Sequence, residues 1–116
     1  MALDQKRGFL FLACDGGGVT VLDEASGKLL GKAASGASTD VIAYSQNLRH
    51  LYVLEPETGR LDIVGISKTG AGELLKTVHT GQWPNCMIAD DRDQVYVCDP
   101  SSGKLFTYKD SLPPSM

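Results

Sequence analysis

The chain has 116 residues, of which 42% are hydrophobic and 22% are charged, and its formal net charge at pH 7 is −3. These values are ordinary for one folded domain, argue against a disordered chain, and leave no basic face for the phosphates of a nucleic acid. The longest apolar run, Phe9–Cys14, is far shorter than the roughly 20 residues that span a bilayer, which argues against a membrane protein.

Short predicted strands follow one another along the chain, and one order of strand and turn recurs three times. Each repeat opens with an inner strand, continues through a polar turn, and then forms its most apolar strand, which suits burial between neighbouring sheets. The inner strands are expected at Met1–Asp4, Val41–Tyr44 and Cys86–Ala89, and the apolar strands at Arg7–Ala13, Arg49–Leu54 and Asp93–Cys98.

Turns that contain glycine, and in two cases proline, lead from the apolar strand of each repeat to a third strand. Glycine allows positive φ, and proline presets φ near −65°. These turns are Asp15–Gly18, Glu55–Gly59 and Asp99–Gly103, and the third strands are expected at Val19–Asp23, Leu61–Ile66 and Leu105–Tyr108. The first two repeats add outer strands at Leu29–Ala33 and Leu74–His79, whereas Ser111–Met116 is too poor a strand former to complete the last repeat.

The repeat has a period in the forties. Tyr52 recurs as Tyr96 after 44 residues, and Phe11 precedes Tyr52 by 41. Such a period, built only of short strands, is typical of β-propeller blades. We therefore predict an all-β fold, a propeller arc of about three four-stranded antiparallel blades with the last incomplete. The domain is placed at residues 1–110, with blades at about 1–35, 36–80 and 81–110, and a C-terminal tail at 111–116.

An arc of this size leaves one apolar face uncovered on its first blade and another on its last. Exposed patches larger than a few hundred Å² are unusual on stable monomers. Two copies would supply six blades, within the usual range of about four to eight, whereas three copies would exceed it. We therefore expect a homodimer that closes a six-bladed ring by head-to-tail contacts. A face-to-face dimer of open arcs and a truncated fragment are the alternatives.

The segments Leu51–Val53, Val95–Val97 and Val19–Asp23, with glycines before the inner strands, resemble the YVTN and NHL group of bacterial β-propeller repeats. The resemblance implies the fold but no single function, because many members of this group have no assigned role. The sequence as given has no signal-peptide pattern, which predicts a cytoplasmic protein. Because relatives of the repeat are often exported, a periplasmic location is the alternative.

Pro84 and Asn85 before the third inner strand are similar to blades of the gluconolactonase-like propellers. This likeness implies that the Asn or Asp after the proline binds a divalent metal at the channel mouth, which makes Asn85 and its counterpart Asp40 candidate ligands for calcium or another divalent ion. The favoured alternative is that both side chains bond turn amides. The sequence departs from that family at Cys86, where glycine is usual, and at Thr39, where proline is usual.

Other polar and aromatic residues carry weaker signals. Trp83 either packs over the blade or contacts a ligand at the channel mouth, and packing is favoured because aromatics bury a large apolar area. His50 and His79 share no evident third partner, so a base or metal role is disfavoured. The three cysteines, Cys14, Cys86 and Cys98, lack metal-ligand spacing and are expected to be small, buried or half-buried and reduced.

No motif in the sequence specifies a nucleophile, a base or an organic cofactor. The leading interpretation is therefore a non-enzymatic binding or interaction module that acts as a homo-oligomer, with Asp40, Asn85 and Trp83 as candidate ligand-binding residues. The alternative is a divalent-metal-dependent, lactonase-like hydrolase assembled across a dimer. A purely structural remnant of a larger propeller is a third possibility. The sequence identifies neither a small-molecule nor a protein ligand.

Overall fold

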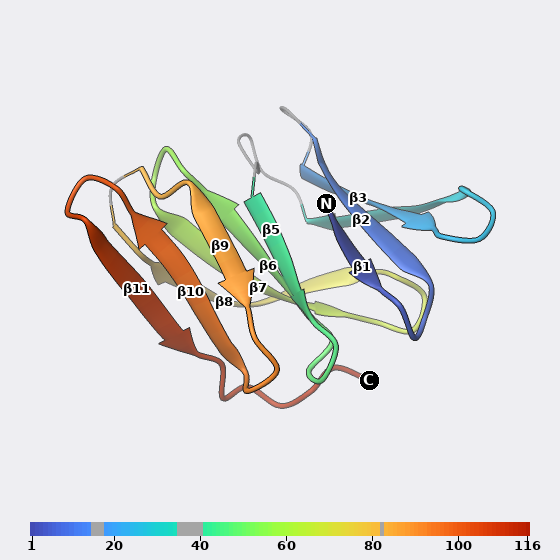
Figure 1. The fold of residues 1–116 in the computed structure, drawn as a ribbon. Coiled ribbons are helices and arrows are strands. Elements are labelled where there is room, and N and C mark those ends of the chain that lie inside the picture. The colour runs from blue at the N-terminus through green and yellow to red at the C-terminus, as the bar shows by residue number, and fades with distance from the viewer. Residues whose placement is uncertain (15–17, 35–40, 82) are drawn as a thin grey trace.

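The strands of the chain form three antiparallel sheets (Figure 1). The computed structural model describes residues 1–14, 18–34, 41–81 and 83–116. Sheet 1 contains β1 (Ala2–Asp4), β2 (Phe9–Cys14), β3 (Gly18–Asp23) and β4 (Leu29–Ala34). Sheet 2 contains β5 (Val41–Ser45), β6 (His50–Glu55), β7 (Arg60–Ile66) and β8 (Gly72–His79). Sheet 3 contains β9 (Cys86–Ala89), β10 (Gln94–Asp99) and β11 (Lys104–Lys109).

Within each sheet the strands lie side by side in chain order, as consecutive hairpins require. The predicted all-β fold class is confirmed, and the described residues contain no helix. Correspondingly, no helix of the described chain could cross a membrane. Residues 15–17 of the predicted Asp15–Gly18 turn lie outside the described residues.

The burial pattern follows the two-residue period of a strand. In β2, Phe9 and Phe11 are buried while Leu10 and Leu12 are only half-buried, and in β10 the buried residues are Val95 and Val97. In β6 of the central sheet, by contrast, five consecutive residues from His50 are buried. Sheet 2 is therefore covered on both faces, whereas each outer sheet buries one face.

Two apolar clusters fill the spaces between the sheets. The members of the first, between sheets 1 and 2, are Phe9, Phe11, Val19, Val21, Ala33, Leu51, Val53, Val64 and Ile66. The members of the second, between sheets 2 and 3, are Tyr52, Leu54, Leu61, Ile63, Val95 and Val97. Burying a large apolar side chain stabilises the fold by about 1.5–3 kcal/mol, so these clusters hold the sheets in one body. The first strands β1, β5 and β9 are neighbours along the arc (Figure 1).

Residues 111–116 form no strand, but they are not a free tail. The segment runs back below sheet 3 toward sheet 2, where Ser115 N donates a hydrogen bond of 2.8 Å to Leu48 O (Figure 1). Arg49 Nε donates to the carbonyl oxygen of Ser115, and Leu112 packs against the second cluster. The segment therefore ties the last sheet to the central one.

Candidate functional site

The structure describes only one member of the predicted metal pair. Asn85 is exposed just before β9, and its Oδ1 lies 2.9 Å from Cys98 Sγ. Its counterpart Asp40 and the neighbouring Thr39 lie outside the described residues. Within the described ranges, no group of three or more His, Cys, Asp or Glu side chains could hold a metal ion. The described geometry therefore gives no support to a lactonase-like metal centre.

Trp83 does not take the packed position that the sequence favours. Its side chain is 62% exposed, on the connection between β8 and β9. Its φ is 53°, in the left-handed region that non-glycine residues seldom adopt. The prediction that Trp83 packs over the blade is therefore wrong. Its contact with a ligand at the channel mouth stays a prediction.

The expectation of three reduced cysteines is wrong for two of them. Cys86 and Cys98 are directly opposite each other on β9 and β10, with Cα atoms 5.3 Å apart, and the structure joins them in a disulfide. Cys14 is the free cysteine of the described chain, and it is exposed rather than buried. The pairing depends on the register of two strands, which the spacing of cysteines alone does not define.

A buried polar network joins sheet 1 to sheet 2. Asp4, at the end of β1, accepts hydrogen bonds from Arg7 Nε at 2.7 Å and from Tyr44 Oη at 2.5 Å. Arg7 also donates to Tyr44 Oη and to the carbonyl oxygens of Ile66 and Ser67. Asp4 is 1% exposed, so its charge is compensated inside the protein rather than by water.

A second network joins sheet 2 to the end of sheet 3. Asp110 Oδ2 lies 2.7 Å from His50 Nδ1 and accepts a hydrogen bond of 2.6 Å from Tyr52 Oη. The other ring nitrogen of His50, Nε2, lies 3.0 Å from Pro113 O. His50 therefore has the acidic partner that the sequence did not indicate, because Asp110 is 60 residues away. His79, in contrast, is exposed at the end of β8.

These networks have a structural role. His50 and Asp110 are buried, and both nitrogens of the imidazole are occupied by protein groups, so no substrate can reach an acid–base pair there. Burial by itself raises the pKa of Asp110, but hydrogen bonds from His50 and Tyr52 outweigh it, and the pKa is lowered overall. The pKa of Asp4 is lowered in the same way, against burial, by bonds from Tyr44 and Arg7.

These lowered pKa values predict a loss of stability in acid. An unfolded Asp titrates near a pKa of about 3.9. Because the folded pKa values of Asp4 and Asp110 lie below that value, their stabilisation is fully present above it and is lost as pH falls through the folded pKa. Urea unfolding between pH 3 and pH 7 should give a midpoint that is flat near neutrality and falls below about pH 4. A midpoint that rises in acid would contradict this assignment.

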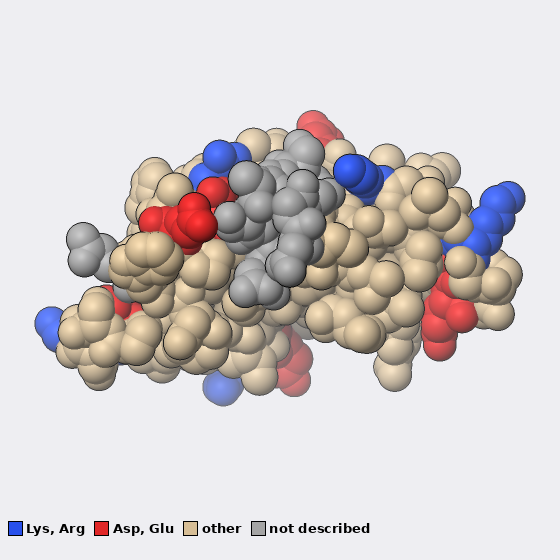
Figure 2. Space-filling view, turned by 90° about the horizontal axis from the view of Figure 1, so that it is seen from above, with Lys and Arg blue, Asp and Glu red and all other residues tan. Residues whose placement is uncertain are grey.

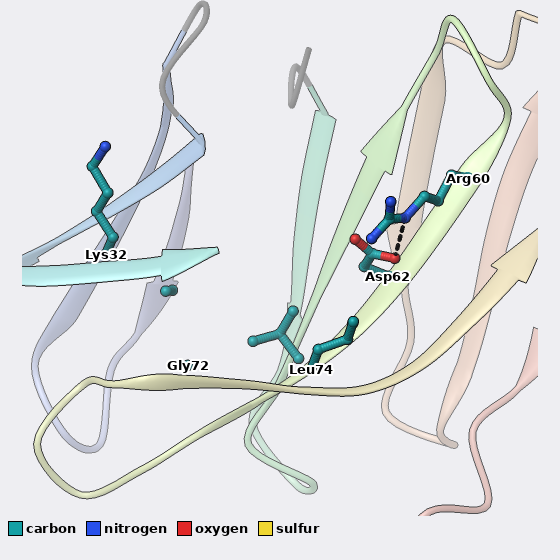
Figure 3. Close-up of a pocket in the computed structure, with 7 residues that line it drawn as sticks. Lys32, Arg60, Asp62, Gly72 and Leu74 are labelled. Carbon is teal, nitrogen blue, oxygen red and sulfur yellow. Dashed lines mark hydrogen bonds and ion pairs between the residues drawn. The ribbon is translucent and has the colours of Figure 1, made fainter. Parts of the chain in front are cut away.

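An open pocket of about 380 Å³ lies between sheets 1 and 2 (Figure 3). Lys32 of β4 is on one wall, and Arg60 and Asp62 of β7 are on the other. Arg60 Nε donates a 2.8 Å hydrogen bond to Asp62 Oδ1, which also accepts one from Thr77 Oγ1. On the face in Figure 2, basic and acidic side chains lie in a few small groups rather than in one charged patch.

A scan of protein-family models and a search of curated proteins gave no match. Among solved structures, the chain is similar to the β-propeller domain of Cps50 (Swd1) from Myceliophteria thermophila, with a TM-score of 0.58 and 14% identity. The chain has a β-propeller fold. The similarity covers 91% of this chain and 36% of that one, so the chain spans about a third of its length. At this identity the likeness shows the fold alone, and the YVTN, NHL and lactonase resemblances gain no support from it.

Proposed function

We propose that the chain is a non-enzymatic β-propeller interaction module that packs against a second copy of itself. The observation that carries the proposal is a repetition of residue types. The uncovered faces of sheets 1 and 3 carry the same kinds of side chain as the two sides of each internal interface. A surface that already forms an interface inside the molecule is suited to form the same interface between molecules.

Each internal interface has an aromatic side and an aliphatic side, named for the residues that the second strands β2, β6 and β10 place in it. Between sheets 1 and 2, Phe11 from sheet 1 meets Leu51 and Val53 from sheet 2. Between sheets 2 and 3, Tyr52 from sheet 2 is in the same cluster as Val95 and Val97 from sheet 3. The second strands therefore meet aromatic onto aliphatic in both cases. Neighbouring strands add partly buried rings to the aliphatic side, namely Tyr44 in the first interface and Phe106 and Tyr108 in the second.

The uncovered face of sheet 3 repeats the aromatic side. Tyr96 is directly opposite Ile88 on β9 and Thr107 on β11, and cross-strand partners share a face. This face lies opposite the one that buries Val95 and Val97, since successive side chains alternate. Ile88 is 65% exposed and Leu105, on the same face, is 60% exposed.

The uncovered face of sheet 1 repeats the aliphatic side. Leu3, Leu10, Leu22 and Leu29 are successive cross-strand partners, so they form one row across all four strands of the sheet. Leu29 is 62% exposed. In the proposed dimer, this leucine row packs against the Ile88 face of sheet 3 from the other copy. Two such contacts close a ring of six sheets, within the range of about four to eight for propellers.

Mass in solution tests the proposal. The wild-type chain should have twice the monomer mass of 12.4 kDa by light scattering after gel filtration. Ile88→Lys and Leu29→Glu should each give monomers, because each places a charge in the dimer contact. The matched control is Leu74→Lys, which alters a 54% exposed leucine on β8, outside both faces.

Mixing the two variants tests the head-to-tail order. In the mixed dimer one interface is wild type on both sides. The other interface places the lysine introduced by Ile88→Lys opposite the glutamate introduced by Leu29→Glu, so dimers should return. A dimer of identical faces would be broken by only one of the two substitutions. The proposal would be wrong if the wild-type chain were a monomer with a cooperative melt. It would also be wrong if Ile88→Lys and Leu29→Glu both remained dimers.

A further inference from the structure

We propose that the pocket between sheets 1 and 2 binds an extended peptide segment in which an acidic side chain lies two residues from a large apolar side chain. The pocket is formed by two sheets of one chain and lies away from the faces used in the proposed dimer. This peptide site is therefore independent of the ring and can be tested in a monomeric variant.

One end of the pocket suits a carboxylate. Asp62 holds the Nε edge of the Arg60 guanidinium, while the terminal nitrogens of Arg60 have no partner among the described residues (Figure 3). A guanidinium fixed in this way presents two parallel donors to an incoming carboxylate. Arg60 neutralises Asp62, and Lys32 on the opposite wall adds a further positive charge, so the pocket favours an anion.

The other end of the pocket is apolar. Val64 of β7 and Leu74 of β8 are cross-strand partners, and both line the pocket with Ala33. Leu74 is 54% exposed, which leaves apolar surface for a ligand to cover. Beside it, Gly72 lies so close to the Ala33 carbonyl oxygen of β4 that any added Cβ would collide with it. The crossing of β4 over β8 therefore closes this end.

The spacing of the two ends matches an extended peptide. Leu74, the exposed apolar side chain, is the cross-strand partner of the buried Val64. Val64 is two residues from Asp62 on the same face of β7, a separation of about 6.7 Å along a strand. An extended ligand repeats the same distance between its own residues i and i+2, whose side chains share a face. A peptide with leucine at i and glutamate at i+2 can therefore reach both ends at once.

The borders of the pocket favour a peptide over a small molecule. Among the described strands, β4 and β8 are edge strands, each paired on one side only. Edge strands carry unpaired backbone N–H and C=O groups, with which an extended peptide can form hydrogen bonds. The pocket thus offers a carboxylate site, an apolar site and two backbone edges in one place.

A labelled peptide tests the proposal. The probe is a fluorescein-labelled, end-capped peptide of sequence Gly-Ser-Leu-Ser-Glu-Ser-Gly, titrated with the protein by fluorescence anisotropy. Wild type should bind it saturably, whereas the same peptide with glutamine for glutamate, or with leucine and glutamate adjacent, should bind at least about tenfold more weakly. No saturable binding, or equal binding of all three peptides, would overturn the proposal.

Variants of the protein assign the site. Arg60→Gln should weaken binding of the probe about tenfold or more, since a charge-assisted hydrogen bond is lost, and Arg60→Lys should have a smaller effect. The matched control is Arg92→Gln, because the Arg92 side chain is 81% exposed on the turn between β9 and β10. It should leave affinity within about twofold. A loss of affinity as large for Arg92→Gln as for Arg60→Gln would show non-specific charge attraction and refute the site.

Discussion

Asp110→Ala should lower the free energy of unfolding by about 3–5 kcal/mol, because it removes a buried carboxylate that two buried side chains share. The carboxylate of Asp110 is the common acceptor of His50 and Tyr52, and the side chains of His50 and Asp110 are fully buried. Alanine would leave both donors without partners in a site that water cannot reach, and it would create a cavity there.

Urea unfolding followed by circular dichroism measures the effect, with two comparison variants. Asp91→Ala removes an exposed aspartate from the turn after β9 and should change stability by less than about 0.5 kcal/mol. Tyr52→Phe removes only one donor to Asp110 and should cost about 1 kcal/mol, so it gives a graded result if the alanine variant does not fold. Equal midpoints for Asp110→Ala and Asp91→Ala would show that the network contributes no stability.

The strands could be predicted because their signals are local. The alternation of Phe9 and Phe11 with leucines identifies a strand and its buried face within a few residues, and a turn such as Glu55–Gly59 identifies the following bend. The free faces of the outer sheets follow from the same alternation. These features require no knowledge of where distant segments lie.

The polar networks and the pocket could not be predicted in this way. His50 meets Asp110 because the end of β11 lies beside the start of β6, and no spacing in the sequence encodes that approach. Likewise, the Cys86–Cys98 pair depends on strand register, and the pocket depends on how β4 crosses β8. The exposure of Trp83 has a different cause. Its hydrophobicity favours burial, but the segment between β8 and β9 leaves its side chain exposed.

Gly59→Ala should destabilise the protein by about 2–5 kcal/mol, because this glycine meets two separate constraints. Its φ is 70°, where an L-residue with a Cβ is strained by about 1–2 kcal/mol. An added Cβ would also collide with the carbonyl oxygen of Gly81. That collision would push apart the Glu55–Gly59 turn and the chain after β8, which are joined by a 2.8 Å hydrogen bond from Thr80 N to Gly59 O.

Gly103 provides a matched control for the second constraint. It ends the equivalent turn of sheet 3 with a φ of 68°, but an added Cβ would meet nothing within 4 Å. Gly103→Ala should therefore cost only the backbone strain of about 1–2 kcal/mol. The difference between the two unfolding free energies, measured in urea, isolates the close approach of Gly59 to Gly81.

Equal losses of stability in the two variants would mean that the segment after β8 moves aside at no cost, so that sheet 2 is not held rigidly at this end. A larger loss at Gly59 would instead mean that the turn and the start of the Trp83 connection are packed as one unit, because the Cβ can be accommodated only by breaking the bond from Thr80.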